Sequence, residues 1–256
     1  MTDLPMIMVA PNGARYSKKD HPALPVTDDE IVGCAVDCFE AGAGAIHLHL
    51  RDQAGRHLLN SKAYAAVVKR IEAATPEMVV QITTEAAGRY SPRQQMQVAL
   101  DAGARHVSIS IREVSEAASS DLAVFLERCV SKGIVLQWIL YDVEDAKALQ
   151  SILPSSMLRS SKLQLLFVLG KYNQVAGQPE DLHPFLEWMS RADLSPDWAV
   201  CAFGNHEPAC LAYAVSKGGK CRTGFENSFR LSNGKVANSN SEKVHDLRAT
   251  VASLSS

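Results

Sequence analysis

The sequence lacks the features that mark several large classes of protein. Its 256 residues carry a formal charge of −2, and no run of Lys and Arg is interleaved with aromatic residues. We therefore expect no nucleic-acid partner. No apolar run approaches the roughly 20 residues that a membrane-spanning helix needs, and the residues after Met1 lack the pattern of a signal peptide. These absences predict a cytoplasmic protein with no membrane partner.

The sequence also lacks paired cysteines and internal linkers. Its six cysteines form no C-x-x-C pair, and most lie in apolar runs, where a thiol behaves as a small hydrophobic group. This pattern favours a reducing compartment and argues against a thiolate metal site. No linker or low-complexity segment divides the chain, so we expect a single domain over residues 1–256.

A regular alternation of strands and helices runs through the whole chain. Thr27 to Glu30 form a capping box before one helix, and Ser91-Pro92 begins another. Eight short apolar runs read as strands: 6–10, 45–50, 78–84, 106–111, 134–141, 163–169, 198–203 and 221–225. This alternation, at this length, predicts an α/β protein with a single (β/α)8 TIM barrel.

Polar residues cluster where the predicted strands end, which is the catalytic face of such a barrel. Glu85, Asp142 and Glu207 each precede a helix start, so a capping role is at least as good an interpretation for these three. The remaining residues of this ring are Asn12, Arg15, His47, His49, Thr83, Thr84, Ser108, Ser110, Tyr141, Asn205, His206, Arg222, Glu226 and Asn227.

His47-Leu48-His49 is the strongest single motif. Because side chains alternate along a strand, both histidines point to one face, where they are either metal ligands or a hydrogen-bonded pair in the core. Glu226 is the best-placed third ligand, and His206 is its rival. With imidazole and carboxylate donors and no thiolate, zinc is the default metal, and manganese and iron are the alternatives. An open coordination position would polarise a substrate carbonyl.

The chain resembles the β-keto acid cleavage enzymes over nearly its whole length. The segments that carry the resemblance are Ala10-Pro11-Asn12-Gly13, His47-Leu48-His49-Leu50-Arg51, Gln81-Ile82-Thr83-Thr84, Leu166-Phe167-Val168-Leu169-Gly170, Trp198-Ala199-Val200 and Gly218-Gly219-Lys220-Cys221-Arg222-Thr223-Gly224-Phe225-Glu226. The resemblance implies a zinc-dependent, retro-Claisen-type reaction. A β-keto acid and acetyl-CoA would give acetoacetate and a new CoA thioester, in a homo-oligomer that is commonly a homotetramer.

The resemblance also implies roles for individual residues. His47, His49 and Glu226 would hold one zinc ion, and Arg222 would stabilise developing negative charge on the substrate. The β-keto acid would be bound by polar residues at the strand ends: Asn12, Arg15, Thr83, Ser108 and Ser110.

Three positions depart from the family pattern. Asn227 stands where a catalytic aspartate is expected, and Ile139, two residues after Gln137, stands where a glutamate is expected. Glu85 and Asp142 are the candidate replacements for the missing acid–base group. Arg15 stands where the aminohexanoate enzyme has an acid. Because a guanidinium favours an anionic partner, Arg15 points to a β-keto dicarboxylic acid as substrate.

Two other functions remain open from the sequence. Barrel lyases and aldolases that act on CoA thioesters also hold a divalent metal with H-x-H and an acid, although their histidine pair is usually late in the barrel. The second alternative is a catalytically silent relative that retains zinc or binds a keto acid, because two acids of the family pattern are missing.

Overall fold

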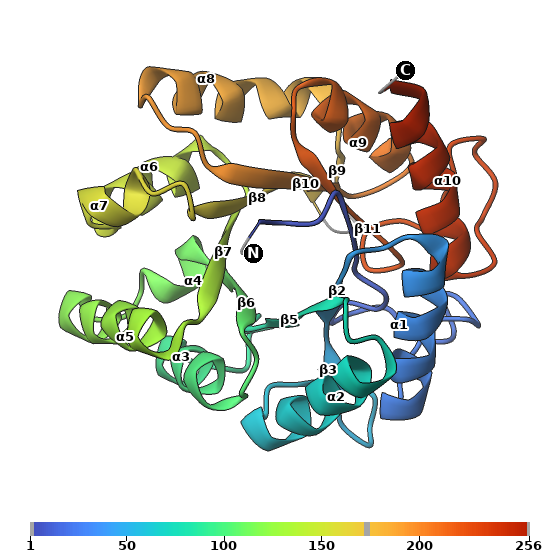
Figure 1. Cartoon of the computed structure of the whole chain (residues 1–256), viewed down its shortest axis with the longest axis horizontal. Helices are drawn as coiled ribbons and strands as arrows, with labels where there is room; N and C mark the ends of the chain where they lie inside the picture. Colours follow the sequence, from blue (N-terminus) through green and yellow to red (C-terminus); the bar gives the residue numbers. More distant parts are fainter. Residues whose placement is uncertain (1–2, 172–174, 255–256) are drawn as a thin grey trace.

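A computed structural model describes residues 3–171 and 175–254, and its parallel strands form a closed barrel (Figure 1). β1 pairs with both β2 and β11, and β8 pairs with both β7 and β10, so the ring has no open edge. The predicted (β/α)8 fold is confirmed. In chain order the barrel strands are β1 (Ile7–Val9), β2 (Ala45–Leu48), β5 (Val79–Thr83), β6 (His106–Ser110), β7 (Val135–Leu140), β8 (Gln164–Lys171), β10 (Asp197–Ala202) and β11 (Lys220–Thr223).

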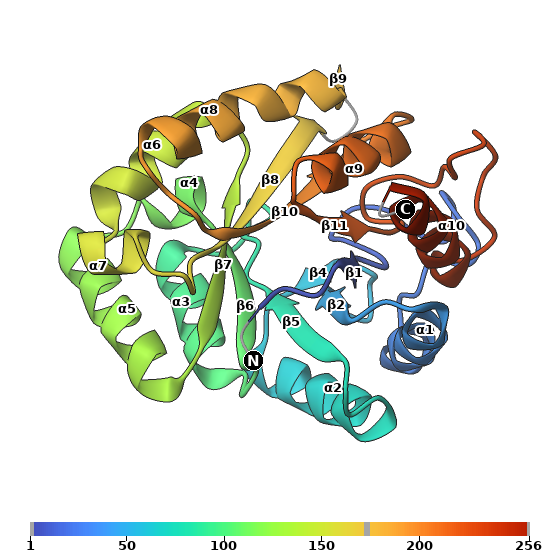
Figure 2. The ribbon, with the colours of Figure 1, turned by 45° about the horizontal axis from the view of Figure 1, so that its top comes forward.

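The helices lie outside the strands and cover the barrel (Figures 1 and 2). The two predicted helix starts are confirmed: Thr27 and Ser91 cap their helices with reciprocal capping boxes. The helices are α1 (Asp28–Ala41), α2 (Ser61–Ala74), α3 (Pro92–Asp101), α4 (Ile111–Val114), α5 (Ser119–Lys132), α6 (Val143–Ile152), α7 (Ser155–Leu158), η1 (Pro179–Leu182), α8 (His183–Arg191), α9 (Glu207–Ser216) and α10 (Asn240–Leu254).

Strand periodicity separates two cores and directs polar groups inward. Ile46 and Leu48 belong to the large core between strands and helices. Ala45 belongs to a smaller core inside the barrel, which Leu4 joins. His47 shares the parity of Ala45 and therefore points into the barrel. The alternation that packs Ile46 and Leu48 against the helices therefore also directs His47 into the barrel.

The predicted strand over 45–50 is interrupted at His49. The barrel strand β2 ends at Leu48, and Leu50–Arg51 (β3) leaves the barrel to pair antiparallel with His57–Leu58 (β4). At the break, the carbonyl oxygen of His49 accepts a hydrogen bond from Asn12 Nδ2 at 2.9 Å, in place of a strand partner. A side-chain amide therefore fixes the backbone that carries the second histidine.

β8 extends beyond the barrel and pairs with the short strand β9 (Val175–Ala176).

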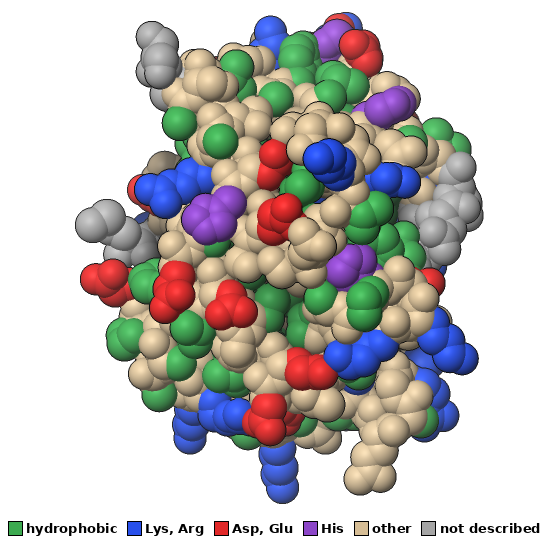
Figure 3. All heavy atoms as spheres, turned by 90° about the vertical axis from the view of Figure 1, so that its right-hand side faces the viewer, with side chains coloured by type: hydrophobic (Ala, Val, Ile, Leu, Met, Phe, Trp, Pro, Cys, Tyr) green, Lys and Arg blue, Asp and Glu red, His purple; other side chains and the backbone are tan. Residues whose placement is uncertain are grey.

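Acidic and basic side chains are interspersed on the face that includes α10 (Figure 3). None of the helices in the described ranges is long and apolar enough to span a membrane.

Candidate active site and metal centre

A cavity of about 460 Å³ opens at the carboxyl ends of the barrel strands. Almost all of the site residues that the sequence predicts line this one cavity, although they come from separate strands and loops. They are Asn12, Arg15, His47, His49, Thr83, Glu85, Ser108, Ser110, Arg222 and Glu226. The barrel therefore converges residues that are up to about two hundred positions apart in the chain.

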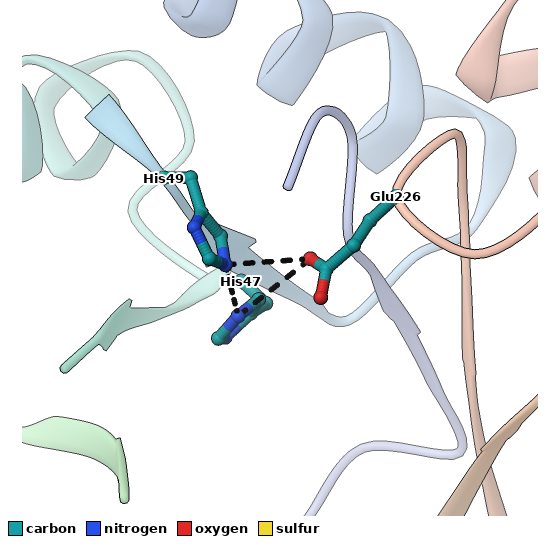
Figure 4. A group of neighbouring side chains, drawn as sticks. All are labelled: His47, His49 and Glu226. Carbon is teal, nitrogen blue, oxygen red and sulfur yellow. Dashed lines mark hydrogen bonds and ion pairs between the residues drawn. The ribbon is translucent and has the colours of Figure 1, made fainter. Parts of the chain in front are cut away.

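His47, His49 and Glu226 point toward one another at the floor of the cavity (Figure 4). The Nε2 atoms of the two histidines are 3.1 Å apart, and Glu226 Oε2 lies 3.7 Å from His47 Nε2 and 3.5 Å from His49 Nε2. Ligand atoms bound at 2.0–2.1 Å to a tetrahedral metal lie about 3.3 Å from one another. The three atoms therefore match the spacing of a transition-metal site.

Both histidines are suited to bind a metal through a lone pair. Burial, together with the nearby Arg222 guanidinium, lowers the pKa of His47 well below its usual value. Burial and the adjacent His57 lower the pKa of His49 in the same direction. Neutral imidazoles are the form that coordinates metals.

The position of Glu226 depends on a glycine across the barrel seam. Gly13 has φ +58°, and a Cβ built at Gly13 would lie 2.6 Å from Glu226 Cγ. Arg222 Nη2 donates to Glu226 Oε1 at 3.0 Å, which leaves Oε2 directed at the two histidines. The absence of a side chain at Gly13 therefore leaves space for Glu226, the candidate metal ligand from the other end of the sequence.

A chain of buried amides supports His47 from behind. His47 Nδ1 lies 2.8 Å from Gln81 Oε1, Gln81 Nε2 donates to Gln137 Oε1 at 2.9 Å, and Gln137 Nε2 reaches the carbonyl oxygen of Leu165 at 3.4 Å. Both glutamines are 1% exposed. This contact suits the tautomer of His47 in which Nδ1–H donates to Gln81 Oε1 and Nε2 keeps its lone pair for a metal.

Replacing Gln81 by leucine is expected to weaken metal binding roughly 10- to 100-fold, because the tautomer and ring orientation of His47 lose their support. Chelator competition on the purified protein measures this affinity directly. Gln97→Leu, on the exposed face of α3, is the matched control and should bind metal as the wild type does. An unchanged affinity in Gln81→Leu would show that the amide chain does not position His47.

Arg222 and two serines present hydrogen-bonding groups without partners in the described structure. Arg222 is 3% exposed, and its Nε and Nη1 atoms have no hydrogen-bond acceptor there. The same holds for the hydroxyls of Ser108 and Ser110. Buried donors are normally satisfied, so unpaired donors lining a cavity indicate a bound polar group. A guanidinium with two free N–H positions suits a carboxylate or an oxyanion.

Glu85 lies beside the histidines and does not cap a helix. Its Oε2 is 3.7 Å from His49 Nδ1, and its Oε1 is 3.7 Å from Arg15 Nη2. Burial and the nearby Glu226 carboxylate raise the pKa of Glu85 to about 7, against the opposing effect of Arg15. A carboxyl group with such a pKa can both accept and donate a proton near neutral pH.

Three other polar residues of the predicted ring lie outside the catalytic cavity. Asp142 caps α6 and pairs with Arg112, so the capping interpretation of Asp142 is correct. Glu207 is buried against Lys243 and accepts from Thr223, which the sequence did not predict. His206 is exposed and is not part of the metal-ligand group, so it is not the third ligand.

Asn227 follows Glu226 in the chain but does not line this cavity. Its side chain is 1% exposed and faces a second cavity of about 360 Å³. Asn227 therefore lies apart from the other predicted site residues. The backbone turns at Gly224, where φ is +140° and a Cβ would clash with Ala10, so consecutive residues after β11 point in different directions.

The family model of the β-keto acid cleavage enzymes matches residues 5–256. The chain belongs to this family. A 3-oxoadipate:acetyl-CoA acetyltransferase from Cupriavidus necator is 27% identical to this β-keto acid cleavage enzyme, over 97% of this chain and 89% of the relative. A 3-keto-5-aminohexanoate cleavage enzyme from Acetoanaerobium sticklandii is 25% identical, over 93% and 88% of the two chains.

The solved structure of ObcA with oxaloacetate has a similar fold, with a TM-score of 0.74 and 15% identity. The match covers 89% of this chain and 63% of the ObcA chain, so the present chain spans less than two thirds of ObcA. Family membership makes the protein a β-keto acid cleavage enzyme, and the names of its relatives indicate acetyl-CoA as the acceptor.

Proposed function

We propose that this enzyme is zinc-dependent and transfers the acyl group of a β-keto acid to CoA. The substrate R–CO–CH2–COO⁻ and acetyl-CoA would give acetoacetate and R–CO–S–CoA. The bond between R–CO and CH2–COO⁻ breaks, and the CH2 carbon forms a new bond to the acetyl group. The R–CO group is transferred to the sulfur of CoA, which loses its acetyl group. The observation that carries the proposal is the convergence of the His47, His49 and Glu226 ligand atoms beside the unpaired donors of Arg222.

The reaction needs an electrophile, a stabiliser of negative charge and a proton carrier. When bound by His47, His49 and Glu226, zinc would supply Lewis acidity to the keto oxygen. The Arg222 guanidinium would offset negative charge that develops on the substrate, because its free N–H groups are already oriented in a buried site.

The substrate-binding wall is formed by short polar side chains. Ser108 and Ser110, at the end of β6, would donate to the keto acid through their unpaired hydroxyls. Thr83 and Asn12 line the same cavity, where Asn12 also fixes the backbone of His49. These side chains orient the substrate between the metal site and the guanidinium.

Glu85 is the proposed acid–base group. Its carboxyl group borders the cavity and would take a proton from the CH2 between the two carbonyl carbons, then return it later in the cycle. Asp142, the other candidate from the sequence, is held by helix capping and by Arg112. Glu85 thereby replaces the acids that are absent at Ile139 and Asn227.

The substrate we propose is a β-keto dicarboxylic acid. Arg15 lines the cavity, its side chain is 58% exposed, and its Nη2 atom lies 3.7 Å from Glu85 Oε1. A distal carboxylate on the substrate would pair with this guanidinium. The Cupriavidus necator relative supports the proposal, because 3-oxoadipate is a β-keto dicarboxylic acid.

Arg15→Ala is expected to lower kcat/KM about tenfold more for 3-oxoadipate than for a monocarboxylic β-keto acid of equal length. The reason is the loss of one partly solvated charge-assisted hydrogen bond. Arg15→Lys is the matched variant and should recover part of the loss. Equal effects on both substrates, or a preference of the wild type for amino-keto acids, would contradict the proposal.

A steady-state assay of β-keto acids with acetyl-CoA, with mass spectrometry of the CoA thioesters formed, tests the overall reaction. A second candidate is a silent zinc-retaining relative, which the replacement of two acids by Ile139 and Asn227 favours. A keto acid that raises the melting temperature without any turnover would support this alternative. A CoA thioester cleaved without acyl exchange would instead indicate a lyase.

The proposal also includes the oligomeric state and the cellular location of the enzyme. The resemblance to the family supports a homotetramer of single-domain chains, and the cysteine pattern supports a cytoplasmic location. Light scattering of the purified enzyme measures the oligomeric state.

A further inference from the structure

The second cavity adjoins the first one at the rim of the barrel. The two cavities share Tyr16, Lys171 and Phe203 in their linings, so a ligand can extend from one into the other. The volume of the second cavity, about 360 Å³, is sufficient for part of an extended cosubstrate.

Asn227 is the most buried polar residue in the lining of the second cavity. It is 1% exposed, and neither Oδ1 nor Nδ2 has a hydrogen-bond partner in the described structure. Leaving a buried amide without partners is costly, so this arrangement indicates a ligand that supplies both a donor and an acceptor. A secondary amide has both groups side by side.

The rest of the lining fits an extended ligand with phosphates at one end. Lys171 and Arg230 contribute positive charge, and no carboxylate is among the described residues that line the cavity. Tyr16, Phe203 and Phe229 add aromatic surface. Aromatic and cationic groups around one amide site suit a chain of methylene and amide units that ends in phosphate.

We infer that the second cavity binds the pantetheine arm of acetyl-CoA and that Asn227 hydrogen-bonds an amide of this arm. The thioester end then enters the first cavity past Tyr16 and Phe203, while the phosphates lie toward Arg230, which lines only the second cavity. The inference rests on the proposed function, because it places the cosubstrate of that reaction. It gives Asn227 a binding role in place of the acid–base role that its neighbouring position suggests.

Isothermal titration with two probes tests the assignment on the full chain. Asn227→Leu is expected to bind both CoA and pantetheine about tenfold more weakly than the wild type, because one amide contact is lost. Arg230→Ala should weaken CoA binding and leave pantetheine binding unchanged, because pantetheine has no phosphate. Asn233→Ala, at an exposed position outside both cavities, is the control and should bind both probes normally.

Asn227→Leu should melt at the same temperature as the wild type or higher, because it removes an unpaired buried amide. Asn227→Ala provides the same binding test if the leucine does not fit. Unchanged affinity for both probes in these variants would overturn the inference while leaving the proposed function intact. A wild type that binds β-keto acid but neither CoA nor pantetheine would overturn the proposed function itself.

Discussion

Replacing His47 or Glu226 by alanine is expected to remove the divalent metal from the purified enzyme and to lower turnover by about 10³-fold or more. Each replacement leaves two protein ligands, which are too few for a stable site with an open position. The loss of the metal also removes the group that would polarise the keto oxygen. Elemental analysis by mass spectrometry, together with steady-state kinetics, measures both effects on the same preparation.

His206→Ala is the control for this experiment. His206 is an exposed histidine near the same face of the barrel, and it does not line the catalytic cavity. Its replacement should leave both metal content and turnover unchanged. A wild-type enzyme without stoichiometric divalent metal would overturn the metal site, and the identity of a bound metal would distinguish zinc from manganese and iron.

Arg222→Met is expected to lower kcat by about 10²- to 10³-fold while the affinity for the substrate changes less. Arg222 lines the cavity, and its Nε and Nη1 atoms have no hydrogen-bond partners in the described structure, so we expect their effect to be largest when negative charge develops on the substrate. Arg222→Lys should restore only part of the rate, because an ammonium group cannot present two parallel N–H bonds. Steady-state kinetics with the preferred keto acid provides the comparison.

Metal content must be measured in the same variants, because Arg222 also donates to Glu226 Oε1. A methionine variant that keeps its metal and loses turnover separates the role of the guanidinium from support of the ligand. A kcat within a few-fold of the wild type, with metal retained, would contradict charge stabilisation by Arg222.

The fold could be predicted from the sequence because its signals are local. Capping at Thr27 and Ser91, and the apolar runs between the helices, are properties of a few consecutive residues. The convergence of His47 and Glu226 could also be predicted, because parallel strands in a barrel all end at the same face. In both cases one general rule of geometry is sufficient.

The remaining features depend on contacts that no local pattern encodes. Gln81 supports His47 only because β2 and β5 pair with these two residues in register. A polar residue in the apolar run 78–84 was the one available signal for it. Asn227 faces a different cavity from Glu226 because of the backbone turn at Gly224, which is set by the close approach of Ala10.

Glu85 illustrates a third limit of the sequence. Its position before a helix favoured capping, yet Ser91 caps α3 and leaves Glu85 beside the histidines. The raised pKa of Glu85 comes from burial and from Glu226, which is more than a hundred residues away in the chain. Long-range electrostatics of this kind becomes visible only when the fold is known.

The pairing of β1 with β11 determines when, during folding, the three ligand residues come together. Gly13 makes room for Glu226 across that seam, and the two histidines come from the second strand of the ring. A ligand held by all three residues can bind only after the last strand has joined the first. A partly folded chain therefore lacks the complete site. A metal held by all three residues would bind only the folded chain and would thereby stabilise the closed barrel.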